Sequence, residues 1–81
     1  MARKIVDNKT WTKINTDQDN FLIQNISGAD VGILVQAGKP ADTVPYDVVI
    51  AQRETICHQD IKGIVWARTI TDASGIVSCL E

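Results

Sequence analysis

Residues 21–36, FLIQNISGADVGILVQ, are the most informative stretch of this chain. Two short apolar runs, 21–23 and 31–35, stand on either side of a polar segment that contains Ser27 and Gly28. Glycine tolerates the positive φ that a tight reversal needs. Short runs rich in Ile, Val and Phe around a Gly-containing loop predict a β-hairpin over these residues.

Within each arm of this predicted hairpin, successive side chains alternate between two faces, as they do in a strand. Phe21 and Ile23 share one face of the first arm, and Leu22 lies on the other. The second arm alternates in the same way and places Leu34 on its second face. Because that second face is also apolar, we expect another sheet or another subunit to cover part of it.

Further β-prone runs lie before and after this stretch. Residues 5–14 predict one strand, or two short strands broken at Asp7-Asn8, and residues 47–51 predict another. Residues 64–70 and 76–80 predict a second hairpin, with Gly75 late in the turn where a left-handed residue is often required. Residues 52–63 are polar and predict a loop or a short edge strand.

The pattern as a whole predicts an all-β protein, a small β-sandwich or barrel of about six to seven short strands. Pro40 and Pro45 place residues 37–46 outside the sheets, because proline donates no hydrogen bond to a ladder. With 81 residues the chain forms at most one domain, so 1–81 is a single β domain, and residues 1–4 are a candidate flexible N-terminal arm.

Such a short chain has a thin core, and proteins of this size often depend on disulfides, metals or partner subunits. Trp66 has apolar neighbours and is expected in the core, whereas Trp11 lies among threonines and Lys13. If Trp11 is exposed, it suits a subunit contact. The candidate interface residues are Trp11, Leu22, Leu34 and Tyr46.

The sequence shows no catalytic residues, no metal ligands and no cofactor motif. Cys57 and His58 are adjacent, so in a strand they would point to opposite faces and could not act as a nucleophile pair. Cys57, His58, Asp60 and Cys79 lack the short spacings of zinc ligands. The carboxylates sit mostly in predicted turns.

Charge and hydropathy argue against two kinds of partner. The net charge of −2 and the dispersed basic residues argue against nucleic-acid binding. No apolar run approaches the length of a membrane span, and no secretory signal follows the N-terminal Met-Ala-Arg-Lys. We therefore expect synthesis in a reducing cytoplasm and two buried thiols at Cys57 and Cys79, although a disulfide between them stays open.

The sequence resembles small structural proteins of tailed bacteriophages. The similarity covers most of residues 20–81 and depends on residues 25–28, 65–68 and 75–78, which read NISG, VWAR and GIVS, and on the terminal Glu81. The polar stretch 53–60 departs from that pattern, because such chains often carry a Pro-Gly or Gly-Glu turn there. The related phage proteins are virion accessory proteins, namely head decoration or cement proteins and the bases of head or tail fibres.

This resemblance implies a non-enzymatic building block of the virion, made in the cytoplasm of the host bacterium. Its implied partners are further copies of itself, as a homo-oligomer and most simply a trimer, and the major capsid protein or another virion component. One alternative is a head-fibre or tail adaptor component. A second alternative is a small carbohydrate-binding β module, which would display Trp11 and Tyr46 close together on one face.

Overall fold

Eight β-strands and no helix make up the part of the chain that the computed structural model describes, residues 2–57, 59, 62–70 and 74–81. The strands follow the predicted runs, and a short break after Val6 separates the first two. Their bounds are β1 Ala2–Val6, β2 Thr12–Lys13, β3 Leu22–Asn25, β4 Val31–Val35, β5 Val48–Ile50, β6 Thr55–Cys57, β7 Val65–Thr69 and β8 Gly75–Leu80.

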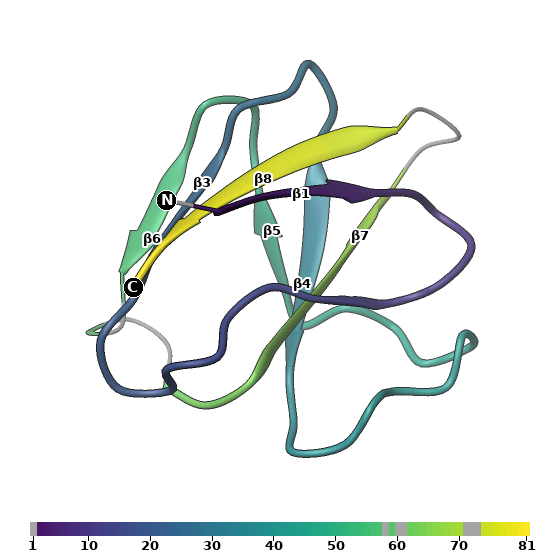
Figure 1. The fold of residues 1–81 in the computed structure, drawn as a ribbon. Coiled ribbons are helices and arrows are strands. Elements are labelled where there is room, and N and C mark those ends of the chain that lie inside the picture. The colour runs from purple at the N-terminus through teal and green to yellow at the C-terminus, as the bar shows by residue number, and fades with distance from the viewer. Residues whose placement is uncertain (1, 58, 60–61, 71–73) are drawn as a thin grey trace.

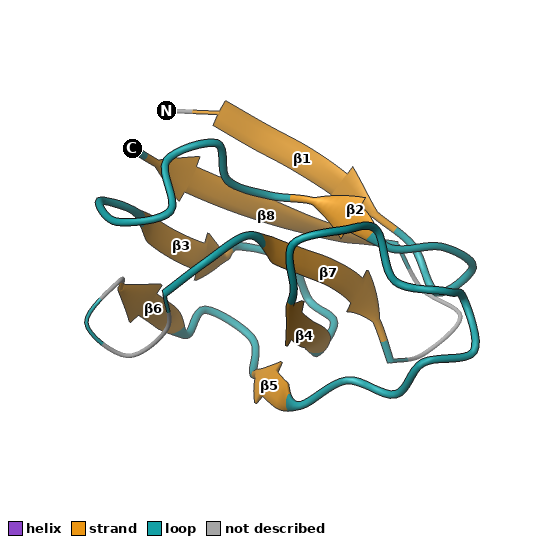
Figure 2. Ribbon diagram, turned by 90° about the horizontal axis from the view of Figure 1, so that it is seen from below, coloured by secondary structure: helices purple, strands orange, loops and turns teal. Residues whose placement is uncertain are grey.

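The strands form two four-stranded sheets that lie against each other (Figures 1 and 2). Sheet A has the order β1-β8-β3-β6 and sheet B the order β2-β7-β4-β5, and every pairing is antiparallel. The prediction of an all-β fold is therefore confirmed, in the form of a sandwich of two sheets.

The strand order identifies the topology. β1 pairs with β8, β2 with β7, β3 with β6 and β4 with β5, so the chain is one long antiparallel ribbon doubled back on itself. Successive pairs of that ribbon fall alternately in sheet A and sheet B. This is the eight-stranded jelly roll, an architecture that occurs in viral capsid proteins, lectins and cupins.

The core lies between the sheets and is built from the inward-facing member of each alternating pair. Ile23 and Val77 enter it from sheet A, and Ile33, Val65 and Ala67 enter it from sheet B. The alternation predicted for the first apolar run is confirmed, because Phe21 and Ile23 are buried whereas Leu22 is exposed.

The two predicted hairpins are wrong. β3 lies in sheet A and β4 in sheet B, so residues 26–30 cross from one sheet to the other. Asn25 fixes this crossing: its fully buried Nδ2 donates to the carbonyls of Ala29 (2.7 Å) and Ile50 (3.1 Å), and its Oδ1 accepts from Ser27. Hydrogen bonds from this sheet A residue to the crossing and to sheet B hold the chain in an arch rather than a tight turn.

The second predicted hairpin fails in the same way, because β7 is in sheet B and β8 in sheet A. Gly75 lies where the sheets approach closely: a Cβ there would come within 2.8 Å of Thr69 Cγ2 and 3.3 Å of Val6 Cγ2. Neither Gly28 nor Gly75 has the positive φ that was predicted, and among the described glycines only Gly63 does (123°). The rest of that predicted turn, residues 71–73, lies outside the described residues.

The N-terminal residues also differ from expectation. Residues 2–4 are not a flexible arm, because they pair with β8 in a regular register from Ala2 opposite Cys79 to Val6 opposite Gly75. The first and last described strands thus lie side by side in sheet A (Figure 1). The predictions for 47–51 and for an edge strand within 52–63 are confirmed by β5 and β6.

Candidate functional site

The outer face of sheet B is covered by the chain itself. The loop of residues 36–47 passes over β7 and β4, and it is fastened by both indole groups. Trp11 Nε1 donates to the Ala41 carbonyl at 3.1 Å, and Trp66 Nε1 donates to the Gln36 carbonyl at 2.9 Å. At the end of the loop the backbone N–H of Asp47 donates to Ile33 O at 2.9 Å.

Arg68 holds the middle of this covered face. Its guanidinium lies 5.4 Å from the ring centroid of Trp11, which is a favourable cation–π distance. The same group donates to the carbonyls of Asp42 and Asn8, so it joins the loop to the segment before β2. Opposite Arg68 in the register is Gly32, and Tyr46 rests directly on its backbone.

The loop determines how exposed three of the residues singled out in the sequence are. Trp11 is 2% exposed and Leu34 is 6% exposed, so neither presents its side chain to a partner in the free chain. Trp66 was expected in the core, and this prediction is wrong. Its side chain is half-buried on the outer face of sheet B, because its neighbours Val65 and Ala67 take the inward positions. Tyr46 is 43% exposed.

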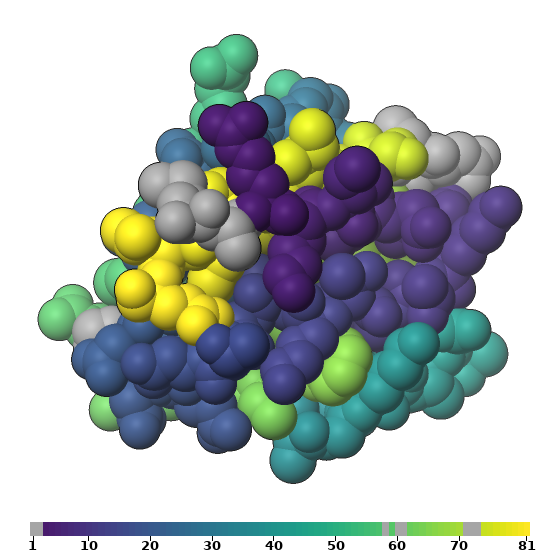
Figure 3. Space-filling view, in the orientation of Figure 1, coloured from purple at the N-terminus to yellow at the C-terminus, as the bar shows by residue number. Residues whose placement is uncertain are grey.

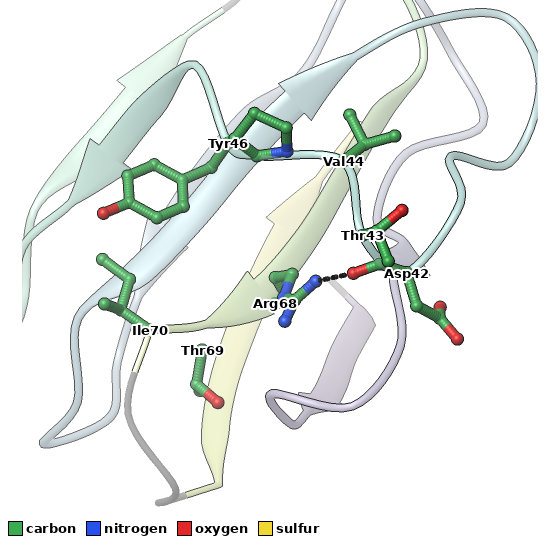
Figure 4. Close-up of a pocket in the computed structure, with 8 residues that line it drawn as sticks. Asp42, Thr43, Val44, Tyr46, Arg68, Thr69 and Ile70 are labelled. Atoms are coloured by element: carbon green, nitrogen blue, oxygen red, sulfur yellow. Dashed lines mark hydrogen bonds between the residues drawn. The ribbon is translucent and has the colours of Figure 1, made fainter.

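A small hollow of about 390 Å³ lies where the loop meets β7 (Figure 4). Tyr46 and Ile70 lie on one side of it and Asp42 on the other, with Arg68 between them. The guanidinium of Arg68 is already bonded to two carbonyls, so it serves the fold rather than a ligand. The carbohydrate-binding alternative requires Trp11 and Tyr46 to be exposed together, and buried Trp11 does not meet that condition.

The outer face of sheet A differs, since large apolar side chains there are open to solvent. Ile5 is 76% exposed and sits directly opposite Ile76, which is also exposed. At the other end of the same face Leu22, 38% exposed, sits opposite Leu80. Figure 3 shows β1 in purple and part of β8 in yellow on the viewer's side of the molecule, while the teal loop lies at the lower right.

A polar belt crosses the centre of this bare face between its two apolar ends. Ser78 is paired in register with Arg3 on one side and Gln24 on the other. These neighbours bury Ser78, and its hydroxyl oxygen has no hydrogen-bond partner among the described residues. A buried hydroxyl without a partner is unfavourable, so this position costs the fold some stability.

The two cysteines are not disulfide-bonded. Cys79 points into the core, whereas Cys57 pairs in register with Leu22 and therefore faces outward. Because β3 separates their strands and they point to opposite faces of sheet A, they cannot bond without rearrangement. Burial, and secondarily the nearby Glu81 carboxylate, raises the pKa of Cys79 to about 11.

Glu81 fastens the chain end to the loop before β3. Its carboxylate accepts hydrogen bonds from both the backbone N–H and the hydroxyl of Thr16. These bonds hold the pKa of Glu81 below its usual value. Within the described residues no three His, Cys, Asp or Glu side chains converge as metal ligands, and His58 and Asp60 of the weighed metal set lie outside them.

Neither a membrane-spanning helix nor a similar known protein gives a clue to the function of the described chain. The described residues include no helix with the length and hydropathy needed to cross a membrane. Comparisons of the chain with protein-family models, curated proteins and solved structures gave no match. The fold and the surface are therefore the grounds on which a function is proposed.

Sequence reasoning singled out Trp11, Leu34 and Tyr46 of the covered face and Leu22 of the bare face, but it missed Arg68 and Ile5. Nothing in the sequence indicated the three contacts of Arg68, because its partners Asp42, Trp11 and Asn8 are 26 to 60 residues away in the chain. Ile5 was recognised only as part of a strand. The available signal was its place beside Val6, since one of two adjacent apolar residues in a strand must face outward.

Proposed function

We propose that this chain is a non-enzymatic structural protein of a tailed-phage virion, working as a homo-oligomer that decorates or stabilises the capsid shell. The observation that carries this proposal is the bare apolar face of sheet A, with Ile5, Leu22, Ile76 and Leu80 exposed on one surface. Exposed apolar patches on small domains mark interaction sites. The jelly roll is also an architecture of viral capsid proteins, although the fold alone does not define a function.

The physical case for assembly follows from size. An 81-residue sandwich has a thin core, so burial of a second apolar surface adds stability that the isolated chain lacks. Many copies bound to one lattice also turn a weak contact into a strong one. A trimer that contacts the major capsid protein is the proposed form, and a head-fibre or tail adaptor role would use the same surface.

The first test is the mass of the purified chain in solution across micromolar concentrations, measured by sedimentation equilibrium. The second is binding to phage capsids that lack the protein, followed by electron microscopy. We expect a trimer that appears as regular density on the shell. A monodisperse monomer that does not bind such capsids would refute the proposal.

A further inference from the structure

A shallow hollow lies at the C-terminal end of the bare face, around the pair formed by Leu22 and Leu80. Its volume is about 500 Å³. The floor is apolar, and among the described residues that line it Glu81 alone has a carboxylate. The residues that line the hollow are Asn20, Phe21, Leu22, Cys57, Gln59, Leu80 and Glu81.

A matching projection lies at the opposite end of the same face. Ile5 is the most exposed of the large apolar side chains described. It is on β1, at one edge of sheet A, whereas Cys57 of the hollow is on β6 at the other edge. Three inter-strand steps of about 4.8 Å separate those edges, so Ile5 cannot reach the hollow of its own chain.

We infer that Ile5 of one copy seats in the hollow of a second copy of this chain. Apolar surface then meets apolar surface on both sides of the contact. The charges are complementary as well, because exposed Arg3 lies on the same side of β1 as Ile5, whereas Glu81 lines the hollow. The occupant argued for is thus a second copy, rather than an unrelated peptide.

The size of the face agrees with this contact. The backbone spans 30 × 25 × 18 Å, so the whole broad face of the sandwich is of the order of the ~800 Å² per partner of a standard interface, and a ring would divide this face between two neighbours. The contact joins two different parts of the surface, so it can repeat from copy to copy and close into a ring. This inference rests on the self-assembly proposed above and names the surface responsible for it.

Cysteine cross-linking tests the contact directly, because the hollow already contains the thiol of Cys57. In Ile5→Cys, mild oxidation of the purified chain should produce covalent oligomers, and peptide mapping should find residue 5 linked to residue 57. Val49→Cys is the matched control, since Val49 is exposed on β5 of sheet B. The double variant Ile5→Cys/Cys57→Ser should lose the 5–57 link.

Ile5→Asp gives an independent measurement that needs no oxidant. The side chain lies outside the core, so the fold should survive, while assembly should weaken at least about tenfold because a carboxylate would enter an apolar hollow beside Glu81. If the wild-type chain assembles but Ile5→Cys forms no 5–57 link and Ile5→Asp assembles equally well, this inference fails and self-assembly stands. A wild-type chain that is monomeric throughout overturns both.

Discussion

The outer faces of the two sheets differ in how far the chain's own loops cover them. On sheet B a twelve-residue loop, 36–47, covers Trp11 and Leu34 and is fastened by indole, guanidinium and backbone hydrogen bonds. On sheet A the described part of the chain places no such loop, and Ile5 and Leu22 are exposed to solvent. The loop therefore covers much of one face, with Tyr46, Val49 and Ile70 still exposed beside it, whereas the other face carries the most exposed apolar side chain described, Ile5.

The difference shows how a short chain uses its limited length. A jelly roll of 81 residues spends most of them on strands and crossings, and its longest described connection covers one face. Covering the second face with a further loop would need a longer chain, whereas another copy can cover it at no cost in length. Four predictions follow from this contrast between a covered and a bare face.

The largest effect is expected at Trp11, on which the covered face depends. Trp11→Ala removes a buried indole, its hydrogen bond to Ala41 and the surface on which Arg68 rests. The free energy of unfolding should fall by about 3–5 kcal/mol, measured by urea denaturation. Trp11→Phe keeps most of the packing and should lose distinctly less. A loss below about 1 kcal/mol for Trp11→Ala would mean that the loop does not cover the face in solution.

Leu34 and Leu22 give a matched pair, one leucine on each outer face. Leu34→Ala should lower the free energy of unfolding by about 2–4 kcal/mol, because Leu34 is 6% exposed under the loop. Leu22→Ala, at 38% exposure, should cost under about 1 kcal/mol in the dilute monomer. The order should reverse for assembly, where sedimentation should show that Leu22→Ala weakens association more. If Leu34→Ala and Leu22→Ala lowered the free energy of unfolding equally, the loop would not cover the face that carries Leu34.

Much of this fold could be predicted from the sequence, and the reason is the strict two-residue period. The alternation of Phe21, Leu22 and Ile23 fixed which side chains entered the core. The strand partners could not be predicted, because a polar segment with a glycine suits both a hairpin and a crossing between sheets. The deciding contacts of Asn25 reach Ile50 and Ala51, about 25 residues away, and no local pattern reveals them.

The candidate surfaces were harder to predict than the strands. Trp11 has polar neighbours in the sequence and Trp66 has apolar ones, yet Trp11 is the more buried of the two. Its burial comes from Ala41 and Arg68, which are distant in the chain. Leu22 and Leu34 were correctly placed on second faces, but which face the loop would cover depends on the sheet to which each strand belongs.

The contact between Gly32 and Tyr46 offers a finer test of the covered face. In Gly32→Ala the new Cβ would lie 2.8–2.9 Å from the Tyr46 ring and its Cβ, which forces the end of the loop outward. We expect a loss of about 1–3 kcal/mol in the free energy of unfolding. In a double-mutant cycle, Tyr46→Ala should relieve most of that loss, because it removes the clashing group. Additive losses would show that Tyr46 does not rest on Gly32.

The last prediction concerns the pH dependence of the free energy of unfolding and depends on Cys79, on the inner side of sheet A. Burial raises the pKa of this thiol from 9.0 to about 11. Between those values the unfolded chain loses the Cys79 proton and the folded chain keeps it, so folding becomes less favourable as pH rises. Stability should be full below pH 9 and should decline towards pH 11 by at most about 1.4 kcal/mol per pH unit.

The measurement for Cys79 is the urea midpoint from pH 8 to pH 11 in the wild type and in Cys79→Ala. The variant should start less stable, because a buried sulfur is lost, but its alkaline decline should be shallower. All other side chains are the same in both proteins, so the difference in slope isolates Cys79. Cys57→Ser, which alters the outward-facing thiol of the same sheet, should keep the wild-type slope. Parallel slopes for the wild type and Cys79→Ala would show that this thiol does not face the core.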